Sequence, residues 1–122
     1  MPLITLNGPI LLAGESLSGP IAVGGDIVRI VMPQKWDSAN LSFQISDDGQ
    51  NFNDLFTYHG REAMISVVPG TTVVVPDALS RSINYLRFRS GPRSHPVPQT
   101  EDRLFAVIVE QGNKATTEDW PQ

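Results

Sequence analysis

The sequence predicts an all-β fold, an antiparallel β-sandwich or jelly-roll-like domain of about eight or nine short strands. The chain has 122 residues, the size of one domain with a single hydrophobic core. It contains ten glycines and ten prolines, and this density of turn-forming residues disfavours helix and suits short strands. Several segments also alternate apolar and polar residues with the period of two that is typical of a half-buried strand.

The N-terminal quarter contains apolar segments that are interrupted by turn-forming residues. Residues 3–12 are apolar but are broken by the sequence NGP at 7–9, which predicts two short extended pieces or an arm. A Gly-Pro pair within residues 16–23 indicates an edge strand or a bend. The sequence GGD at 24–26 predicts a turn. Residues 27–32 then form a nearly continuous apolar run, which is typical of a strand covered on both faces.

The segment 36–58, WDSANLSFQISDDGQNFNDLFTY, is the most regular part of the chain. Residues 41–46 alternate strictly, so we expect the first, third and fifth side chains to face the core and the serines and glutamine between them to face solvent. The following DDGQ at 47–50 predicts a hairpin turn, because glycine supplies the positive φ that such turns need. Residues 52–58 form the returning strand.

The C-terminal half continues the pattern of short strands and turns. We expect further strands at 62–68, 71–75, 83–90 and 103–110. The last of these has six consecutive apolar residues, which favours the centre of a sheet. Residues 77–82 have room for one helical turn, and 91–99 contain three prolines and form an irregular loop. The chain therefore divides into an N-terminal arm or edge strand (1–15), a β-sandwich (16–110) and a polar tail (111–122).

Composition excludes several classes of function. The chain has no cysteine, so disulfides, thiol catalysis and thiolate metal sites are absent. Its formal net charge is −4, which argues against nonspecific nucleic-acid binding through clustered basic residues. No apolar run is long enough to span a membrane. We expect no nucleic-acid partner and no membrane partner.

No motif points to catalysis, to a metal or to a cofactor. Asp47 and Asp48 lie at a hairpin tip, where aspartate usually forms the turn itself. The surrounding DDGQNFND lacks the ligand order of an EF-hand, although a loop calcium remains open as an alternative. His59 and His95 have no partner at metal-ligand spacing. We therefore expect a protein that is not an enzyme, with no catalytic residue, no metal and no cofactor.

Two tryptophans and a basic strand are candidates for contacts with partners. Trp36 is interpreted as a core residue, with stacking on a sugar ring as the alternative. Trp120 lies in the polar tail, where an isolated large aromatic residue is either an anchor on a neighbouring subunit or part of a disordered segment. Arg87 and Arg89 share one face of strand 83–90 and are candidates for contact with an acidic partner, unless neighbouring carboxylates balance them.

Three segments carry a family resemblance. They are AGESLSGPIAVGG at 13–25, IVRIVMPQKWDSANLSFQISDDGQNFNDLF at 27–56 and INYLRFRSGPRSHPVPQTEDRLFAVIVE at 83–110. The chain resembles small β-sandwich virion proteins of tailed phages and prophages of alphaproteobacteria, of the head decoration or auxiliary type. The resemblance covers most of residues 13–110. Phe56 stands where the family has tyrosine, and residues 93–95 replace small residues.

The resemblance implies a capsid decoration protein that binds the outer surface of the major capsid protein. It implies assembly in the host bacterial cytoplasm, a place on the surface of the virion head, and a homo-oligomer, a trimer or another form. The N-terminal arm, with Leu3, Ile4 and Leu6, and the tail with Trp120 are then candidate tethers, because extended segments can pair with a sheet edge of a partner.

Two alternatives stay open. The hairpin block also resembles carbohydrate-binding jelly rolls, which implies a module of a tail fibre or baseplate with Trp36, Tyr58, Asp48 and Asn51 at a glycan site. The other alternative is a head-tail completion or tail component. Ring-forming symmetry and a low copy number in the virion would distinguish it from decoration.

Overall fold

The computed structural model describes residues 2–76, 81 and 83–111, and every regular element in these ranges is a β-strand. The strands are β1 (Leu3–Leu11), β2 (Ile21–Val31), β3 (Leu41–Ser46), β4 (Asn53–Asp54), β5 (Met64–Ile65), β6 (Thr72–Val74), β7 (Ile83–Ser90) and β8 (Arg103–Glu110). They pair in the order β1-β8-β2-β7-β3-β4, with β5 added to β3 and β6 added to β2, and every pairing is antiparallel. The predicted all-β, antiparallel, sandwich-like fold is confirmed.

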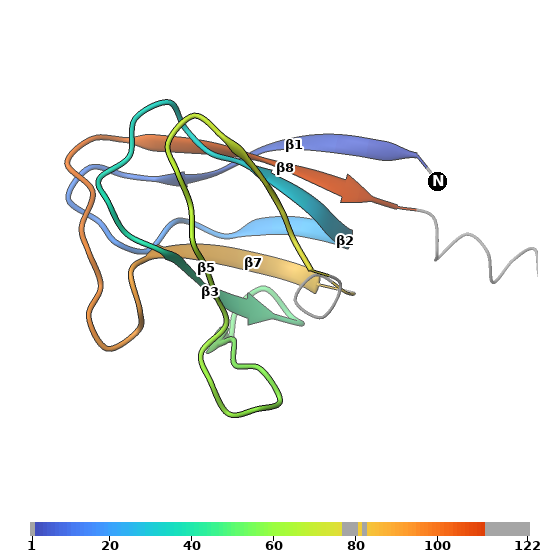
Figure 1. Cartoon of the computed structure of the whole chain (residues 1–122). Helices are drawn as coiled ribbons and strands as arrows, with labels where there is room; N and C mark the ends of the chain where they lie inside the picture. The colour runs from blue at the N-terminus through green and yellow to red at the C-terminus, as the bar shows by residue number, and fades with distance from the viewer. Residues whose placement is uncertain (1, 77–80, 82, 112–122) are drawn as a thin grey trace, which may run out of the picture.

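Strand β2 belongs to two layers and connects them. Residues 21–25 pair with β7, whereas residues 26–31 pair with β8 and β6. We call β1, β8, the second half of β2 and β6 sheet A, and the first half of β2, β7, β3, β4 and β5 sheet B. Figure 1 shows β1 and β8 in one layer, above β7 and β3 in the other. This division into two antiparallel sheets that share one long strand is jelly-roll-like.

The predicted turn at residues 24–26 is wrong, because the strand passes through it. The pairing register shifts between Ala22 and Gly25, where β2 leaves sheet B and enters sheet A. A Cβ atom on Gly25 would lie 2.7 Å from the carbonyl oxygen of Glu110, so only glycine allows the two strands to approach this closely. The glycine pair therefore marks the bend of a strand and not its end.

Strand β1 is one paired edge strand. It runs antiparallel to β8 from Leu3 opposite Glu110 to Leu11 opposite Arg103, with a register shift at the cis Gly8-Pro9 bond. The other neighbour of β8 is β2. Strand β8 is therefore the inner strand that its apolar run predicted.

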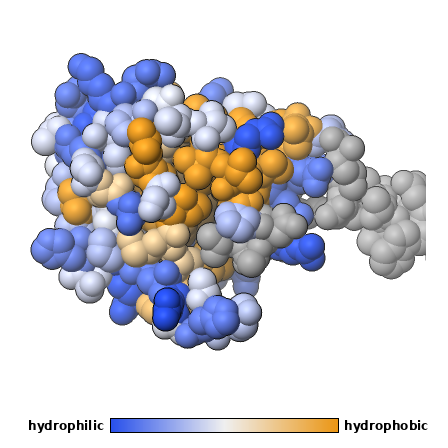
Figure 2. Space-filling view, in the orientation of Figure 1, coloured by the Kyte–Doolittle hydropathy of each residue, from blue (hydrophilic) through white to orange (hydrophobic). Residues whose placement is uncertain are grey.

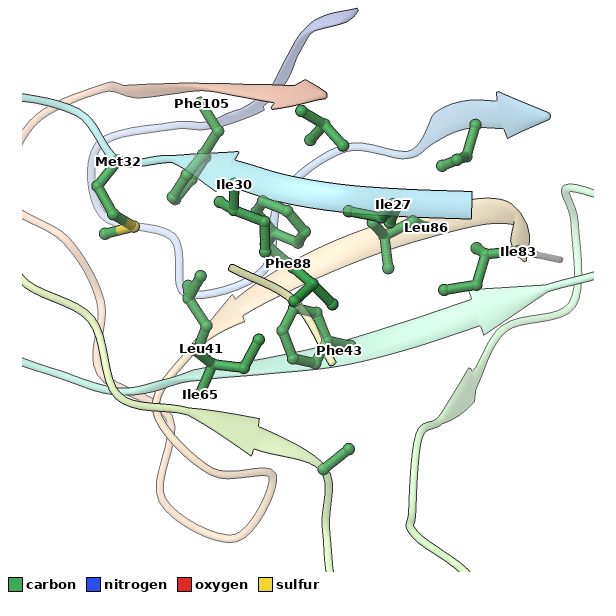
Figure 3. Close-up of a cluster of buried hydrophobic side chains, with 14 of the residues drawn as sticks. Ile27, Ile30, Met32, Leu41, Phe43, Ile65, Ile83, Leu86, Phe88 and Phe105 are labelled. Atoms are coloured by element: carbon green, nitrogen blue, oxygen red, sulfur yellow. The ribbon is translucent and has the colours of Figure 1, made fainter. Parts of the chain in front are cut away.

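The core lies between the two sheets and contains a chain of aromatic rings (Figure 3). Phe88 packs edge-to-face on Phe43 and on Phe105, with ring centroids 5.5 and 4.9 Å apart. Trp36 packs edge-to-face on Phe105 at 5.6 Å, and its indole Nε1 donates to the carbonyl oxygen of Ala39. Only 8% of Trp36 is exposed, so its interpretation as a core residue is confirmed.

A buried glutamine holds the proline-rich loop. Gln99 is 1% exposed, and its amide donates to the backbone oxygen of Asp37 at 3.0 Å and to Ser90 Oγ at 2.9 Å. Its side-chain oxygen accepts from the Asp37 N–H and from Arg103 Nε. These four bonds satisfy the amide completely, as a buried polar group requires. The loop is irregular, as predicted, but it is pinned to both sheets.

Two predicted segments are not covered by the structure. The expected helical turn at 77–82 falls almost entirely on residues outside the described ranges, and so does Trp120 in the polar tail. In the ranges that are described, no helix has the length and hydrophobicity to cross a membrane.

Candidate functional site

The outer face of sheet B carries a cluster of four charged side chains. Arg89 projects outward from β7, where its guanidinium pairs with Asp54 of β4 and lies 3.2 Å from Glu62 Oε2. Arg93, from the loop after β7, donates from Nε to the second Asp54 oxygen at 2.8 Å. The backbone N–H of Arg93 also points at the Glu62 carboxylate. We call these four residues the ionic cluster.

The ionic cluster is balanced in charge, and three of its four side chains are largely closed to solvent, whereas that of Arg93 is 55% exposed. The side chain of Arg89 is 8% exposed, that of Glu62 12% and that of Asp54 20%. Burial raises the pKa of Asp54, but hydrogen bonds from Arg93, Arg89 and Gln44 outweigh it and hold the pKa at about 2. Asp54 therefore stays ionised at neutral pH. A carboxylate fixed in this way is suited to holding structure and not to proton transfer.

The two arginines that were predicted to contact a partner are engaged within the chain. Arg89 faces outward from its strand as expected. The other residues of the ionic cluster cover it, so it is not an open contact surface. Arg87 is partly buried, and its guanidinium stacks over the ring of Phe52 at 4.4 Å from the centroid. Arg87 Nε is a buried atom without a hydrogen-bond partner. Sequence reasoning missed Glu62 and Arg93, because no local signal connects residues so far apart in the chain.

The acidic hairpin turn is satisfied by its own backbone. One oxygen of Asp48 accepts from the N–H groups of Gln50 and Asn51, and the other accepts from the Asn51 side-chain amide. These bonds hold the pKa of Asp48 far below its ordinary value. Gly49 has a φ of +80°, as predicted for the turn. Asp48 therefore acts as a turn former.

A second hairpin, Phe56–Glu62, presents aromatic side chains to solvent. The Thr57 N–H donates to the Arg61 carbonyl oxygen at 2.7 Å, which closes a tight loop. Tyr58 at the tip is 91% exposed, and its ring centroid lies 4.0 Å from that of His59. The hairpin is the light green loop that extends from the two layers in Figure 1. Its tip is available to a partner.

Two shallow hollows flank this hairpin. One, of about 430 Å³, is lined by residues that include Asp48, Asn51 and Phe56. The other, of about 610 Å³, lies under the hairpin and includes Phe56, Tyr58 and Met64. Three of the four residues proposed for a glycan site thus lie in or beside one region. The fourth, Trp36, is wrong as a sugar platform because it is in the core on Phe105.

The outer face of sheet A differs in character. Ile10 of β1 and Leu104 of β8 are directly opposed in the pairing register, and each keeps about half of its surface exposed. Leu12 follows at the end of β1 and is also exposed, as is Val74 on β6. Figure 2 shows a separate group of hydrophobic residues, on the side of the molecule that the yellow-green segment of Figure 1 crosses.

The arrangement offers no metal site in the described ranges. Within them, no three histidine, aspartate or glutamate side chains are grouped to hold an ion. His59 lies at the hairpin tip, and His95 lies in the proline-rich loop. Comparisons of the chain with protein-family models, with curated proteins and with solved structures find no match.

Proposed function

We propose that the chain is a structural protein of a phage virion, a decoration protein that binds the outer surface of the major capsid protein. The family resemblance of residues 13–110 supports this role. The observation that carries it is the exposed cross-strand pair Ile10 and Leu104, with Leu12 beside it. Exposed apolar side chains that gather on a sheet are typical of surfaces that bind other proteins.

The charged residues support the same role. The ionic cluster and the acidic turn use their carboxylates to hold sheet B and its loops, so those groups contribute to stability. The net negative charge suits the outside of a capsid better than its DNA-filled interior. Burial of exposed leucine and isoleucine would then favour capsid binding, because it removes apolar surface from water. Repetition over the capsid lattice would strengthen a weak single contact if one copy bridges two sites.

The first test is the copy number of the chain in purified, DNA-filled virions. Quantitative mass spectrometry with immunogold labelling is expected to find hundreds of copies spread over the head. A few copies at the tail or portal would contradict decoration and would favour the head-tail completion alternative.

The second test addresses the contact surface. Heads that lack the protein are mixed with purified variants, and bound protein is measured by sedimentation. Leu104→Glu is expected to reduce binding at least about tenfold, because it places a charge in the centre of the contact. Val74→Glu is the matched control, an exposed apolar residue at the opposite edge of sheet A. Equal loss in both variants would contradict the assigned surface.

A glycan-binding module remains the second candidate, and the exposure of Phe56 and Tyr58 favours it. Aromatic faces of this kind stack on the apolar face of sugar rings. A glycan array that gives hits, with binding abolished by Tyr58→Ala and unchanged by Val68→Ala, would support it. An array without hits would exclude it.

A further inference from the structure

We propose that two copies of the chain pair through their β1 strands, antiparallel and in one register centred on Thr5. The proposal concerns the free edge of sheet A and does not depend on the capsid role. Figure 1 shows β1 along the outside of β8, with no other described strand beyond it.

The backbone pattern shows which groups are free on this edge. The Gln111 N–H donates to the carbonyl oxygen of Pro2, so these two residues form a hydrogen-bonded pair. In an antiparallel ladder, such pairs recur at every second residue. Ile4 opposite Val109 and Leu6 opposite Val107 are therefore the next hydrogen-bonded pairs. The alternate residues of β1 direct their N–H and C=O groups away from β8.

These alternate residues are Leu3, Thr5 and Asn7. Their side chains are exposed on the outer face of sheet A, and their backbone groups point along the plane of the sheet into open space. Among the described residues, these three donors and three acceptors have no partner, and such a row is a template for one more strand. Because an antiparallel partner needs the same alternation, a second β1 strand provides the complementary groups.

Strand β1 also lacks the features that usually protect an edge. Residues 3–11 contain no charged side chain, and the only proline lies at the bulge beyond Asn7. The other edge strands in the described ranges are short, with three residues in β6 and two each in β4 and β5. Short edges resist pairing, so β1 is the edge on which a partner strand fits best.

One register uses all of the free groups. If Thr5 lies opposite Thr5 of the second copy, Leu3 lies opposite Asn7, and about six backbone hydrogen bonds form. A shift by one pair in either direction loses one of these three hydrogen-bonded pairs. In the same register, Ile4 faces Leu6 on the inner side. Both are only partly buried in the single chain, so each would cover the other in the dimer.

A second copy of the chain fits this edge, because the free backbone groups of one β1 strand match those of another β1 strand in antiparallel orientation. Because β1 has no charged side chain, no like charges oppose each other along the paired strands, and the paired threonines are β-branched residues that favour a strand. The two chains are then related by a two-fold axis through Thr5, which is the symmetry of an isologous dimer.

Cysteine cross-linking tests the proposal directly, since the chain contains no cysteine of its own. Opposed residues in a hydrogen-bonded pair have Cα atoms about 5.5 Å apart, within the range that a disulfide spans. Thr5→Cys is expected to form a disulfide-linked dimer under mild oxidation. Thr72→Cys, an exposed threonine on the opposite edge strand β6, is the matched control and is expected to stay monomeric on a denaturing gel.

The register has its own test. Leu3→Cys alone and Asn7→Cys alone are expected not to cross-link, because each cysteine lies about four residues from its copy. An equimolar mixture of the two is expected to cross-link. Cross-linking of Thr72→Cys as fast as Thr5→Cys, or of Leu3→Cys alone, would overturn the proposed pairing.

Equilibrium measurements complete the test. Analytical ultracentrifugation of the unmodified chain from ~1 to ~500 µM is expected to show a monomer–dimer equilibrium. Thr5→Lys places two like charges opposite each other and should weaken it at least about tenfold, whereas Thr72→Lys should not. Hydrogen exchange should show that the amides of Leu3, Thr5 and Asn7 gain protection with concentration. A chain that stays monomeric throughout, or amides already protected in the monomer by another segment, would overturn the proposal.

Discussion

The outer faces of the two sheets differ in how their side chains are covered. On sheet B, the ionic cluster covers the outward side chains of β3 and β7, and almost every charged group there has a partner within the chain. On sheet A, the outward residues Ile10 and Leu104 stay half exposed, and the edge strand β1 keeps one side of its backbone unpaired. The charged side chains of sheet B therefore bind one another across its outer face, whereas the outer face of sheet A keeps apolar side chains exposed.

The difference comes from the loops. Asp54 lies in β4 at the edge of sheet B beside β3, Glu62 precedes β5, and Arg93 lies in the loop after β7. The side chains of Asp54 and Glu62 pair with Arg89, and that of Arg93 pairs with Asp54. In the described residues, no such loop crosses the middle of β1 and β8.

Arg89→Met should lower the free energy of unfolding, because it disrupts the ionic cluster on sheet B. The variant keeps the volume of the side chain but leaves Asp54 and Glu62 as neighbouring carboxylates without their shared cation. Removal of one partner from a buried ionic group typically costs about 3–5 kcal/mol, and urea unfolding should show a loss in that range. A loss below about 1 kcal/mol would mean that the cluster does not hold the sheet.

Low pH should reduce the stability that the ionic cluster contributes. The pKa of Asp54 is lowered from an ordinary 3.8 to about 2, so the unfolded chain binds the proton more tightly. This contribution to stability is complete above about pH 5 and is lost as pH falls through about 2, with a total of about 2 kcal/mol. Thermal unfolding between these pH values measures it. Asp54→Asn should be less stable at neutral pH and should show a flatter pH dependence.

Arg93→Ala should have a smaller effect than Arg89→Met. Its side chain is 55% exposed, so solvent and salt screen its pairing with Asp54. The variant also loses the contact of the guanidinium with the Phe56 ring, at 5.7 Å. Added salt should reduce the difference between this variant and the parent chain, whereas the deficit of Arg89→Met should persist. Equal salt sensitivity would contradict the buried character of Arg89.

Leu104→Ala should change stability least, by less than about 1 kcal/mol, because it removes only one exposed cross-strand contact with Ile10. Leu86→Ala is the matched control, with a leucine that is 1% exposed, and should cost about 2–5 kcal/mol. Urea unfolding of both variants makes the comparison. A large loss for Leu104→Ala would mean that the outer face of sheet A supports the fold.

Much of the local structure could be predicted from short sequence patterns. Strands β3, β7 and β8 begin and end where alternation and apolar runs predicted, because a period of two can be read along the chain. The tight turn at Gly49 and the burial of Trp36 were also predicted, from the demand for positive φ and from the size of the indole. The strand boundaries and the turn depend on residues close together in the sequence, whereas the position of Trp36 in the core also needs Phe105 of β8.

The groups that cover each strand could not be predicted in this way, because they come from tertiary contacts. Ser42 and Ser46 were expected in solvent, but both are buried. Ser42 donates to the carbonyl oxygen of Gly91 in the loop after β7, whereas Ser46 bonds within its own hairpin, to Asp48 and Gly49. Arg89 is buried in a similar way, by its ion pairs with Asp54 and Glu62. The bend of β2 through Gly25 depends on how closely Glu110 of β8 approaches. Alternation tells which residues share a face, but the contacts that cover a face join segments far apart in sequence, and no local pattern records them.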